Sequence, residues 1–550
     1  YKANLKTLTI TRNPFGFINK KKMEKYIGVA LSKTNDQGNV SDEDFEKIVA
    51  SILKKEDIEI LTSGIKINLY KALPDKLDDF KEFFIEGNGN LKNDILFKRR
   101  ILGLTSYYRS AQEELMPNFD KDKDFHVEKI PMSDYQFALY EKARVNERKL
   151  EKSNKKKKQM QKKTDDIYED AVSTYRIFSR AFCNFVFPDN KRPMPKEEED
   201  IEDITLQTAT EDLMDAATVE EKLNNPDGLY SGEDIDQLND NSSKEKDSSY
   251  ELRIKEALEF LERNSANYLS KEGLQIYSPK FLNVLENIED EDFKGLHLVY
   301  SQFRTLEGIG IFSLVLKQNG FAQFKIKRES NTDRWVLDRK ETDIGKPMYA
   351  LYTGTESQEE KEILRNIFNS DWNNVPDSLV DQLKPIASNN YMGELIKVLM
   401  ITASGAEGIT LKNVRYVHIM EPYWHPVRIE QVIGRARRIA SHENLPVELR
   451  TVEVFLYLMT FSAEQTTGDK AIELRLKDRS KLDNETPLTS DEALYEIATI
   501  KEEITRKILR QVKESAIDCS IHTSGGKNKE QLKCFTFGKP NNSTFAYMPS

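Results

Sequence analysis

Residues 397–441 read KVLMITASGAEGITLKNVRYVHIMEPYWHPVRIEQVIGRARRIAS, and this stretch decides the fold. Two apolar runs in it, VLMIT and VRYVHIM, have the length and composition of buried strands. A loop of small residues separates the two runs, and Pro426 then suits the first turn of a helix. A strand, a loop, a second strand and a helix in this order predict a parallel sheet covered by helices.

The alternation of strands and helices extends on both sides of this stretch, so we expect an α/β chain with several structural units. The expected segments are a small α/β subdomain at 1–75, a helical linker at 76–123, the start of the main domain at 124–275, the main α/β domain at 276–480 and a helical extension at 481–550. In the extension, apolar residues recur every three or four positions, and Thr489 and Glu492 have the spacing of a capping box.

The charge pattern breaks sharply before the main domain. Nine basic residues and one acid lie between Arg148 and Lys163, which predicts a solvated helix end. Eighteen acids and four lysines lie in residues 196–248, which predicts a disordered insertion. Between these runs, YRIFSRAFCNFVFP reads as an apolar helix that Pro188 ends.

The net charge, the cysteine count and the absence of long apolar runs exclude several classes of protein. A net charge of −10 argues against a protein coated in basic surface, although a local basic groove is enough to bind nucleic acid. Three cysteines cannot form a disulfide framework, so we expect a reducing compartment. No run approaches the roughly 20 apolar residues of a membrane span, and no signal peptide opens the chain. Because the chain starts at Tyr1 inside a polar segment, we expect a fragment that lacks its N-terminal portion.

The helix that follows Pro426 carries an amide and two guanidinium groups. At 100° per residue, Gln431, Arg435 and Arg438 fall within about 60° of one another, so we expect them on one face. Gly434 leaves room there for a close backbone approach. Permanent positive charges on a rigid face can stabilise the charge that builds on a γ-phosphoryl group during its transfer. A basic face that is solvated or paired with acids is the alternative interpretation.

Polar side chains also follow the predicted strands, at the sheet edge where α/β folds bind ligands. Ser404 and Gly408 lie in the loop after VLMIT, where small residues let backbone amides approach phosphate oxygens. Ser301, Gln302 and Arg304 follow the strand LHLVY and can reach a phosphate backbone. A tight turn without any ligand is the alternative for the loop.

Four motifs in this order resemble a known family. YSQF, ITASGAEGITL, EPYWHP and QVIGRARR look like motifs IV, V, Va and VI of superfamily 2 helicases and Swi/Snf-type translocases. FKRRILGLTSYY, YRIFSRAFCNFVFP, SPKF, VYSQFRTLEGIGIF and KESAIDC are similar to segments of the helicases of large cytoplasmic DNA viruses. That group includes the poxvirus early transcription factor ATPase subunit and nucleoside triphosphate phosphohydrolase I. Thr410 and His425 stand where Swi/Snf proteins have asparagine, which favours the viral group.

The resemblance implies a role for each matched residue. It makes Arg435 and Arg438 the arginine fingers that act on ATP, with Gln431 orienting them. The residues implied to face the nucleotide are Gly408, Thr410 and Gly434. The residues implied to contact nucleic acid are Ser301, Gln302, Arg304, Thr402, Ser404, Trp424 and His425.

The resemblance also implies a fold and a function. The fold would be the RecA-like second lobe of a helicase, and residues 76–123 would end the first lobe. The function would be the C-terminal part of a nucleic-acid-dependent ATPase in viral early transcription or transcription termination. Its cofactors would be ATP and Mg²⁺, bound mainly by the missing lobe. Its partners would be DNA, with RNA as the alternative, and a viral RNA polymerase or transcription-factor subunit. The virion and the viral factory of the host cytoplasm would be its location.

Two other functions fit the same motifs. One is a Swi/Snf-type chromatin translocase, and the other is a non-catalytic lobe that acts as a scaffold in a transcription complex. The retained Gln431, Arg435 and Arg438 speak against the scaffold. No phosphate-binding G-x-x-x-x-G-K-S/T motif occurs, and the DEAL string at Asp491 reads as a helix cap. We therefore expect that residues 1–550 alone hydrolyse no ATP.

The remaining cysteines and histidines predict no metal centre. Cys519, His522 and Cys534 supply only three ligands and lack zinc-finger spacing. His297 and His418 lie in predicted strands, where we expect them to be core or rim residues.

Overall fold

The computed structural model describes residues 2–4, 7–10, 17–23, 25–31, 42–58, 73–74, 76–87, 89–106, 115–159, 176–190, 192, 248–329, 331–353, 356–402, 408–467, 477–523 and 532–535. The chain forms two compact units, Tyr1–Asp79 and Phe80–Ser550. The predicted acidic insertion lies outside the described residues, except for Ser248 at its end. No helix among the residues described combines the length and the apolar character that a membrane span requires.

The first unit contains two antiparallel strand pairs and a helix. Its elements are β1 (Lys2–Asn4), β2 (Thr7–Thr9), β3 (Phe17–Lys22), β4 (Lys25–Leu31) and α1 (Asp42–Lys55). β1 pairs with β2 and β3 pairs with β4. These are the elements of an α/β unit.

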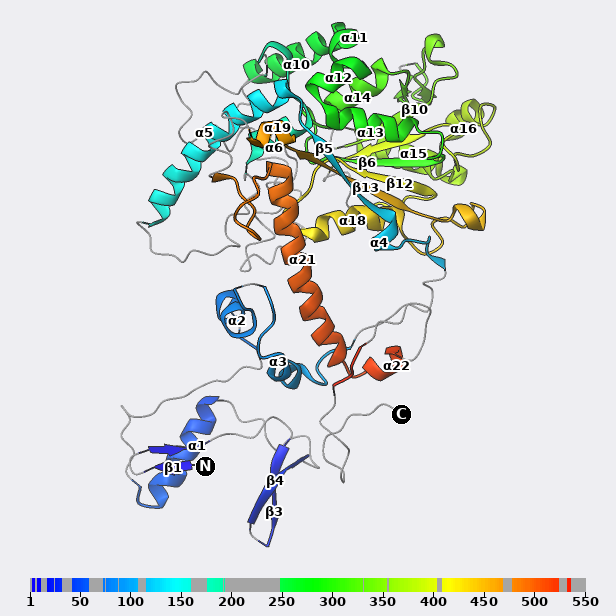
Figure 1. Ribbon diagram of the computed structural model, residues 1–550. Helices are drawn as coiled ribbons and strands as arrows, with labels where there is room; N and C mark the ends of the chain where they lie inside the picture. Colours follow the sequence, from blue (N-terminus) through cyan, green and yellow to red (C-terminus); the bar gives the residue numbers. More distant parts are fainter. Residues whose placement is uncertain are drawn as a thin grey trace. The chain divides into compact units, whose positions relative to one another are not determined.

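The second unit is built on a seven-stranded parallel sheet (Figure 1). Its strand order is β5-β13-β12-β6-β11-β10-β7, and every neighbouring pair runs parallel. The strands are β5 (Phe125–Pro131), β6 (Leu296–Tyr300), β7 (Ala322–Gln323), β10 (Met348–Tyr352), β11 (Val398–Ile401), β12 (Val414–Ile419) and β13 (Glu453–Thr460). A separate hairpin joins β8 (Ile326–Arg328) to β9 (Trp335–Leu337). The predicted α/β class with a RecA-like parallel sheet is confirmed.

Helices cover both faces of this sheet, as Figure 1 shows. The helices of the region from residue 77 onward are α2 (Leu77–Phe84), α3 (Asp94–Ile101), α4 (Lys121–Asp124), α5 (Asp134–Gln159), α6 (Ile177–Asn184), α10 (Ser248–Arg263), α11 (Ser265–Tyr268), α12 (Lys271–Tyr277), α13 (Pro279–Glu289), α14 (Ile309–Gln318), α15 (Gln358–Phe368), α16 (Asp377–Leu383), α18 (Pro426–Ala436), α19 (Ala463–Thr467), α21 (Ser490–Glu514) and α22 (Cys519–Thr523). Short 3-10 turns lie at η3 (Pro188–Asn190), η4 (Glu341–Asp343), η5 (Trp372–Asn374) and η6 (Val447–Leu449).

The central strands are buried on both faces, which explains their almost continuous apolar sequence. In β6, Leu298 and Tyr300 join the core shared with α15, α16 and α18. Val299, between them, joins the core shared with α6, α13 and α14. Successive side chains of a strand point to opposite faces, so a strand between two helical layers must be apolar at every position.

The two strand histidines are core residues, as predicted. His297 Nδ1 lies 3.0 Å from His418 Nε2, and His418 Nδ1 lies 2.7 Å from the hydroxyl of Tyr457. Burial lowers the pKa of His418 to about 3. Burial also holds the pKa of His297 well below its ordinary value, with the neighbouring His418 acting in the same direction. Both rings are therefore neutral at physiological pH.

The long helix α21 begins where the sequence predicted. Thr489 and Glu492 form the capping box, and the Thr489 hydroxyl also donates to the carbonyl of Met459 at the end of β13. Asp491 does more than cap the helix, because its carboxylate forms a buried ion pair with Lys280 of α13 at 2.6 Å. The start of α21 is thus fixed to both the sheet and a covering helix.

Two local predictions were wrong. Helix α6 ends at Asn184 and not at Pro188, because Phe185 is already extended and Val186 donates its N–H to the carbonyl of Tyr277. The position before a proline disfavours helix in any case. Arg148 is not solvated: its guanidinium is buried and bonds to Asp478 at 2.7 Å. The arginines around Asp478 offset the effect of burial and lower the pKa of this carboxyl to about 2.

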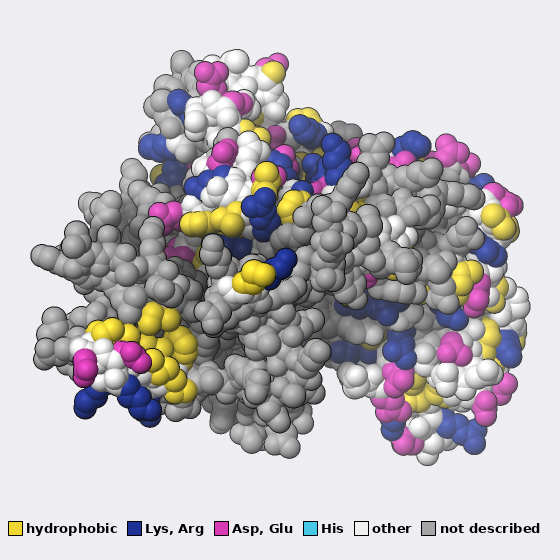
Figure 2. Space-filling model, turned by 90° about the horizontal axis from the view of Figure 1, so that it is seen from below, with side chains coloured by type: hydrophobic (Ala, Val, Ile, Leu, Met, Phe, Trp, Pro, Cys, Tyr) yellow, Lys and Arg dark blue, Asp and Glu magenta, His cyan; other side chains and the backbone are white. Residues whose placement is uncertain are grey.

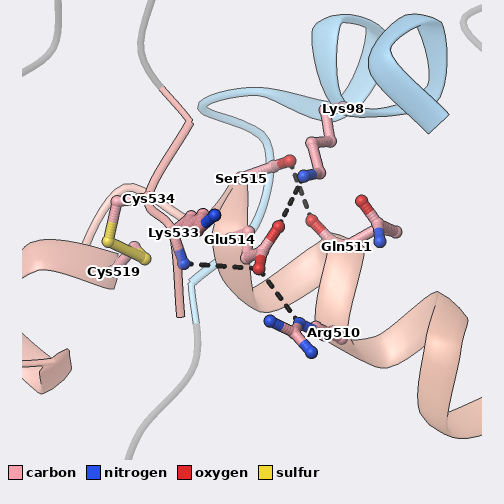
Figure 3. Close-up of a disulfide and its surroundings, with 8 residues drawn as sticks. All are labelled: Lys98, Arg510, Gln511, Glu514, Ser515, Cys519, Lys533 and Cys534. Atoms are coloured by element: carbon pink, nitrogen blue, oxygen red, sulfur yellow. Dashed lines mark hydrogen bonds and ion pairs between the residues drawn. A yellow bond between two sulfur atoms is a disulfide. The ribbon is translucent and has the colours of Figure 1, made fainter. Parts of the chain in front are cut away.

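The cysteine prediction also requires correction. Cys519 and Cys534 form a disulfide across a sequence separation of 15 residues (Figure 3). Segment 532–535 lies against the end of α21, where the Phe535 N–H donates to the carbonyl of Glu514. The Glu514 carboxylate binds Lys98 of α3 and Arg510 (Figure 3). Two sulfurs joined in a disulfide are not thiolate ligands for a metal. The number of cysteines could not reveal that this pair meets.

Candidate nucleotide and nucleic-acid site

The end of α18 meets the turn that follows the loop of small residues. Arg438 donates from Nη2 to the carbonyl of Ile409 at 3.2 Å, and Leu411 donates its N–H to the carbonyl of Arg435 at 3.4 Å. These two bonds join residues of the predicted motifs V and VI, which the sequence had placed together only by resemblance. The arginines and the turn therefore lie in one place.

The turn itself is exposed and has a left-handed residue at Gly408. Gly408 is exposed with φ of 72°, a left-handed conformation that favours glycine. Thr410 is exposed as well, and its carbonyl accepts a hydrogen bond from the side-chain amide of Asn369 at 2.9 Å. The hydrogen bond from Asn369 thus holds the backbone of the turn, while Gly408 and Thr410 remain exposed.

Arg438 reaches this turn from a loop and not from the helix. Helix α18 ends at Ala436, and Arg437 already has extended backbone angles. The Arg438 N–H donates to Ser441 Oγ at 3.3 Å, which holds the loop that follows the helix. The helical-wheel prediction for Arg438 was therefore wrong in its geometry, although Gln431 and Arg435 do share the helix, with Gln431 exposed and Arg435 half-buried.

Gly434, near the end of α18, and Arg437, just after it, differ in their surroundings. A Cβ added at Gly434 would meet no atom within 4 Å in the described part of the chain, so the helix surface there is open. Arg437, by contrast, stacks its guanidinium 4.6 Å from the ring centre of Phe119. The middle arginine of the run GRARR thus holds the segment before β5 and does not face the turn at Gly408.

The polar residues at the end of β6 are buried. Ser301 is 0% exposed and donates its hydroxyl to Glu421 Oε1 at 2.5 Å. Gln302 is 2% exposed; its backbone N–H donates to Glu421 Oε2 at 3.0 Å and its side chain accepts from Arg180 at 2.5 Å. Ser301 and Gln302 thus position the loops after β6 and β12, and this conformation offers neither side chain to a phosphate backbone.

The other residues that were predicted to contact nucleic acid at these strand ends differ in their exposure. Thr402, after β11, is 0% exposed. Ser404 lies outside the described residues. Arg304 is half-buried, so part of its side chain reaches the surface. Of the polar residues that follow the strands, Arg304 is the one described with an accessible charged group.

Glu421 is the centre of this buried edge, and sequence reasoning assigned it no role. Its carboxylate also accepts from the side-chain amide of Asn184 at 2.5 Å. Asn184 in turn accepts from Lys280, whose ammonium bonds to Asp491 and to the carbonyl of Met420. Burial raises the pKa of Glu421, while the nearby Lys280 acts in the opposite direction. An acid directly after a buried strand was the available signal for Glu421.

Trp424 and His425 lie at the start of α18. Trp424 is half-buried, and its ring centre lies 4.0 Å from Nζ of Lys501 on α21. His425 is exposed and caps α18, because its Nδ1 accepts from the Val427 N–H at 3.3 Å. Burial lowers the pKa of His425, and the charge of Lys501 does so too. Lys501 was missed because a single lysine on an amphipathic helix gives no signal in the sequence.

Comparisons with known proteins agree with this geometry. Residues 378–440 match the family described as Helicase conserved C-terminal domain. A protein of Acanthamoeba polyphaga mimivirus named as an ATP-dependent RNA helicase is 27% identical over 492 residues, which cover 84% of this chain and 52% of the relative. A termination factor NPH-I homolog of African swine fever virus, isolate Pig/Kenya/KEN-50/1950, is 28% identical over 50% of this chain and 37% of its own length.

A solved structure, the C-terminal part of the Fun30 ATPase domain, is 14% identical with a TM-score of 0.31 and covers 71% of this chain and 99% of its own. The chain spans about half the length, or less, of the curated relatives described above. Residues 378–440 are thus similar to the C-terminal domain of helicases. The chain resembles the C-terminal portion of these viral helicases and NPH-I homologs.

Proposed function

We propose that this chain is the second motor lobe of a nucleic-acid-dependent ATPase, and that it presents Arg435 and Arg438 to ATP held by another lobe. The observation that carries the proposal is the bond from Arg438 to the carbonyl of Ile409, beside Gly408. This bond brings the Arg438 side chain to the turn that contains the exposed Gly408, which supports the proposal. Gln431, exposed on the same helix, is proposed to orient the arginines on the nucleotide.

The chemistry follows from the charge of these side chains. A guanidinium stays protonated and can form two parallel bonds to phosphate oxygens, so it can stabilise the charge that builds during γ-phosphoryl transfer. The residues proposed to face the nucleotide are Gly408, Thr410 and Gly434. In the part of the chain that the structure describes, no group of three or more acidic, histidine or cysteine residues could hold a metal. Mg²⁺ is therefore proposed to be bound mainly by the ATP-cradling lobe.

The biological process is proposed from the relatives. The African swine fever virus relatives bear the name of termination factors, so a role in viral transcription, with a viral RNA polymerase or transcription-factor subunit as partner, is the favoured process. The mimivirus relatives bear the name of RNA helicases, so RNA stands beside DNA as the polymer on which the motor acts. ATPase stimulation by duplex DNA, single-stranded DNA and RNA, measured in parallel, distinguishes these polymers.

The test of the proposed function is an ATPase measurement on the full-length protein. Replacing Arg438 with alanine is expected to reduce nucleic-acid-stimulated hydrolysis by about a thousandfold or more, the effect of losing an arginine finger. Arg365→Ala is the matched control, because Arg365 lies on α15 and pairs with Glu362 at 3.3 Å. Near-normal turnover of Arg438→Ala contradicts the proposal.

A second measurement concerns residues 1–550 alone. We propose that this polypeptide folds and hydrolyses no ATP, because the sequence contains no Walker lysine motif to hold the phosphates. Purified residues 1–550 should show no hydrolysis above that of the Arg438→Ala variant purified in the same way. Hydrolysis that nucleic acid stimulates, and that Arg438→Ala abolishes, contradicts this part of the proposal.

A further inference from the structure

Nucleic-acid affinity in this chain needs a source other than the buried polar residues of the strand ends. Ser301 and Thr402 are 0% exposed, and Gln302 is 2% exposed. The net charge of −10 supplies no general attraction to phosphates. On the face in Figure 2, lysine and arginine side chains are interspersed with acidic and hydrophobic ones. Particular cations that the fold holds in place are therefore candidate phosphate contacts.

Lys501 is such a cation, because α21 holds it over an aromatic ring. Its Nζ lies 4.0 Å from the ring centre of Trp424, within the range of a cation–π interaction. In the described part of the chain, the Trp424 indole Nε1 is buried and has no hydrogen-bond partner. An indole N–H is a donor only, and a buried one usually finds an acceptor. The contact between Lys501 and Trp424 therefore combines a positive charge with a buried indole N–H that has no partner in the described part of the chain.

The rest of the fold fixes Lys501 in this position. The capping box at Thr489 and the ion pair between Asp491 and Lys280 lock the start of α21. Lys501 lies ten residues further along the helix than Asp491, which places it about 15 Å from this anchor. Helix α21 also packs against α18, whose first residues follow Trp424. A rigid helix thus spares Lys501 much of the entropy that a mobile lysine would lose on binding.

No described carboxylate neutralises Lys501. The structure places no acidic group within ion-pair distance of its ammonium in the described ranges, whereas Lys507, on the same helix, pairs with Glu503 at 2.9 Å. Burial lowers the pKa of Lys501 to about 8, and the charges of Lys481 and Lys81 act in the same direction. An added anion would therefore be favoured here.

We propose that Lys501, held over the ring of Trp424, is a contact site for the phosphodiester backbone of a nucleic acid, with its ammonium paired to a phosphate. This inference rests on the proposed function and extends its nucleic-acid surface from the helicase motifs to the C-terminal helix. Trp424 lies just before α18 and Arg435 lies near its last residue, so roughly 15 Å of helix separates Lys501 and Trp424 from the residue proposed to act on the nucleotide. The phosphate at Lys501 thus belongs to the polymer and not to ATP.

The competing explanation is packing alone, in which Lys501 only covers the ring of Trp424. Lys501→Met separates the two explanations, because methionine keeps an unbranched apolar stem on the ring and removes the charge. Lys501→Arg keeps a cation that can also stack on the ring. Lys507→Met removes one positive charge from the same helix and serves as the charge-matched control.

The experiment is a binding titration of fluorescently labelled single-stranded and duplex oligonucleotides, of two unrelated sequences each, at several salt concentrations. Lys501→Met should weaken binding several-fold at low salt, equally on both sequences, and reduce the slope of log K against log salt by about 0.7–0.9. Lys501→Arg should restore the slope, and Lys507→Met should leave it unchanged.

Three results overturn the inference, and they differ in what else they overturn. An unchanged slope and affinity for Lys501→Met overturns the inference alone if Arg304→Ala still weakens binding, because the proposed nucleic-acid surface then survives. An equal loss for Lys501→Met and Lys507→Met also overturns the inference alone, since any charge on α21 would then count. Failure of the wild-type chain and of the full-length protein to bind any of these oligonucleotides overturns the proposed function as well.

Discussion

The buried ion pair between Lys280 and Asp491 gives the sharpest prediction about stability. Nζ of Lys280 lies 2.6 Å from Oδ2 of Asp491, and both side chains are 0% exposed. At an effective dielectric constant of about 20, such a pair attracts with about 6 kcal/mol, which the cost of removing both charges from water largely offsets. Removing one partner leaves the desolvation cost without the attraction. Lys280→Met should therefore lower the free energy of unfolding by about 3–5 kcal/mol.

A double-mutant cycle separates this effect from simple loss of packing. Asp491→Asn keeps an oxygen that can accept the N–H of Met459, as Asp491 does at 3.1 Å, and removes the negative charge. The variant with both Lys280→Met and Asp491→Asn should be destabilised by at least about 1–2 kcal/mol less than the sum of the single variants, because no unpaired charge remains from the pair.

Urea unfolding followed by tryptophan fluorescence is the appropriate assay. The chain has three tryptophans, Trp335, Trp372 and Trp424, and all lie in the unit that contains the parallel sheet, so the signal reports this unit. An Arg365→Ala control removes one charge of an exposed pair and should cost less than about 1 kcal/mol. Additive effects of the two single variants would refute the reasoning.

Three further predictions concern stability. Burial lowers the pKa values of His297 and His418 in the folded state, so their contribution to the free energy of unfolding is complete above about pH 6.5 and is lost as the pH falls, by up to about 1.4 kcal/mol per pH unit for each histidine. Urea midpoints at pH 7 and pH 5 should therefore differ, and equal midpoints would argue against buried neutral rings. Thr489→Ala removes the cap of α21 and a hydrogen bond to Met459, and should cost about 1–2 kcal/mol in the same assay, whereas Thr499→Ala, in the middle of the helix and exposed, should cost less than half as much. Reducing the disulfide between Cys519 and Cys534 should speed backbone hydrogen exchange at Phe535, whose N–H bonds to the carbonyl of Glu514. The exchange rates of β6 should not change. If exchange at Phe535 does not respond to reduction, the disulfide does not hold this segment.

The sequence predicted the parallel sheet because its signal is local. Strands such as VLMIT and VRYVHIM are apolar at nearly every position, and only burial between two helical layers explains that pattern. The capping box at Thr489 was equally predictable, because both of its residues lie within one helical turn. The ends of other elements were less so: α18 stops at Ala436, where Ser441 and Leu115 hold the chain that follows.

The burial of predicted site residues could not be predicted from the sequence. Ser301 is covered because Glu421 accepts its hydroxyl, and these residues are 120 positions apart. Cys519 and Cys534 meet because segment 532–535 lies against the end of α21, which no spacing rule specifies. Lys501 lies over Trp424 only because α21 packs on α18. Each of these relations depends on tertiary packing, whereas sequence patterns report the immediate neighbourhood of a residue.

The central claim is that this lobe supplies arginines that act on ATP during hydrolysis. Its most direct test is the single-turnover rate of ATP hydrolysis by the full-length protein with Arg435→Ala, measured together with the dissociation constant for ATP. We predict that the rate falls by about a thousandfold or more, while the dissociation constant changes by less than about tenfold, because a finger acts mainly in the transition state. A rate within a few-fold of the wild type, or a loss of ATP binding as large as the loss of rate, would contradict the claim.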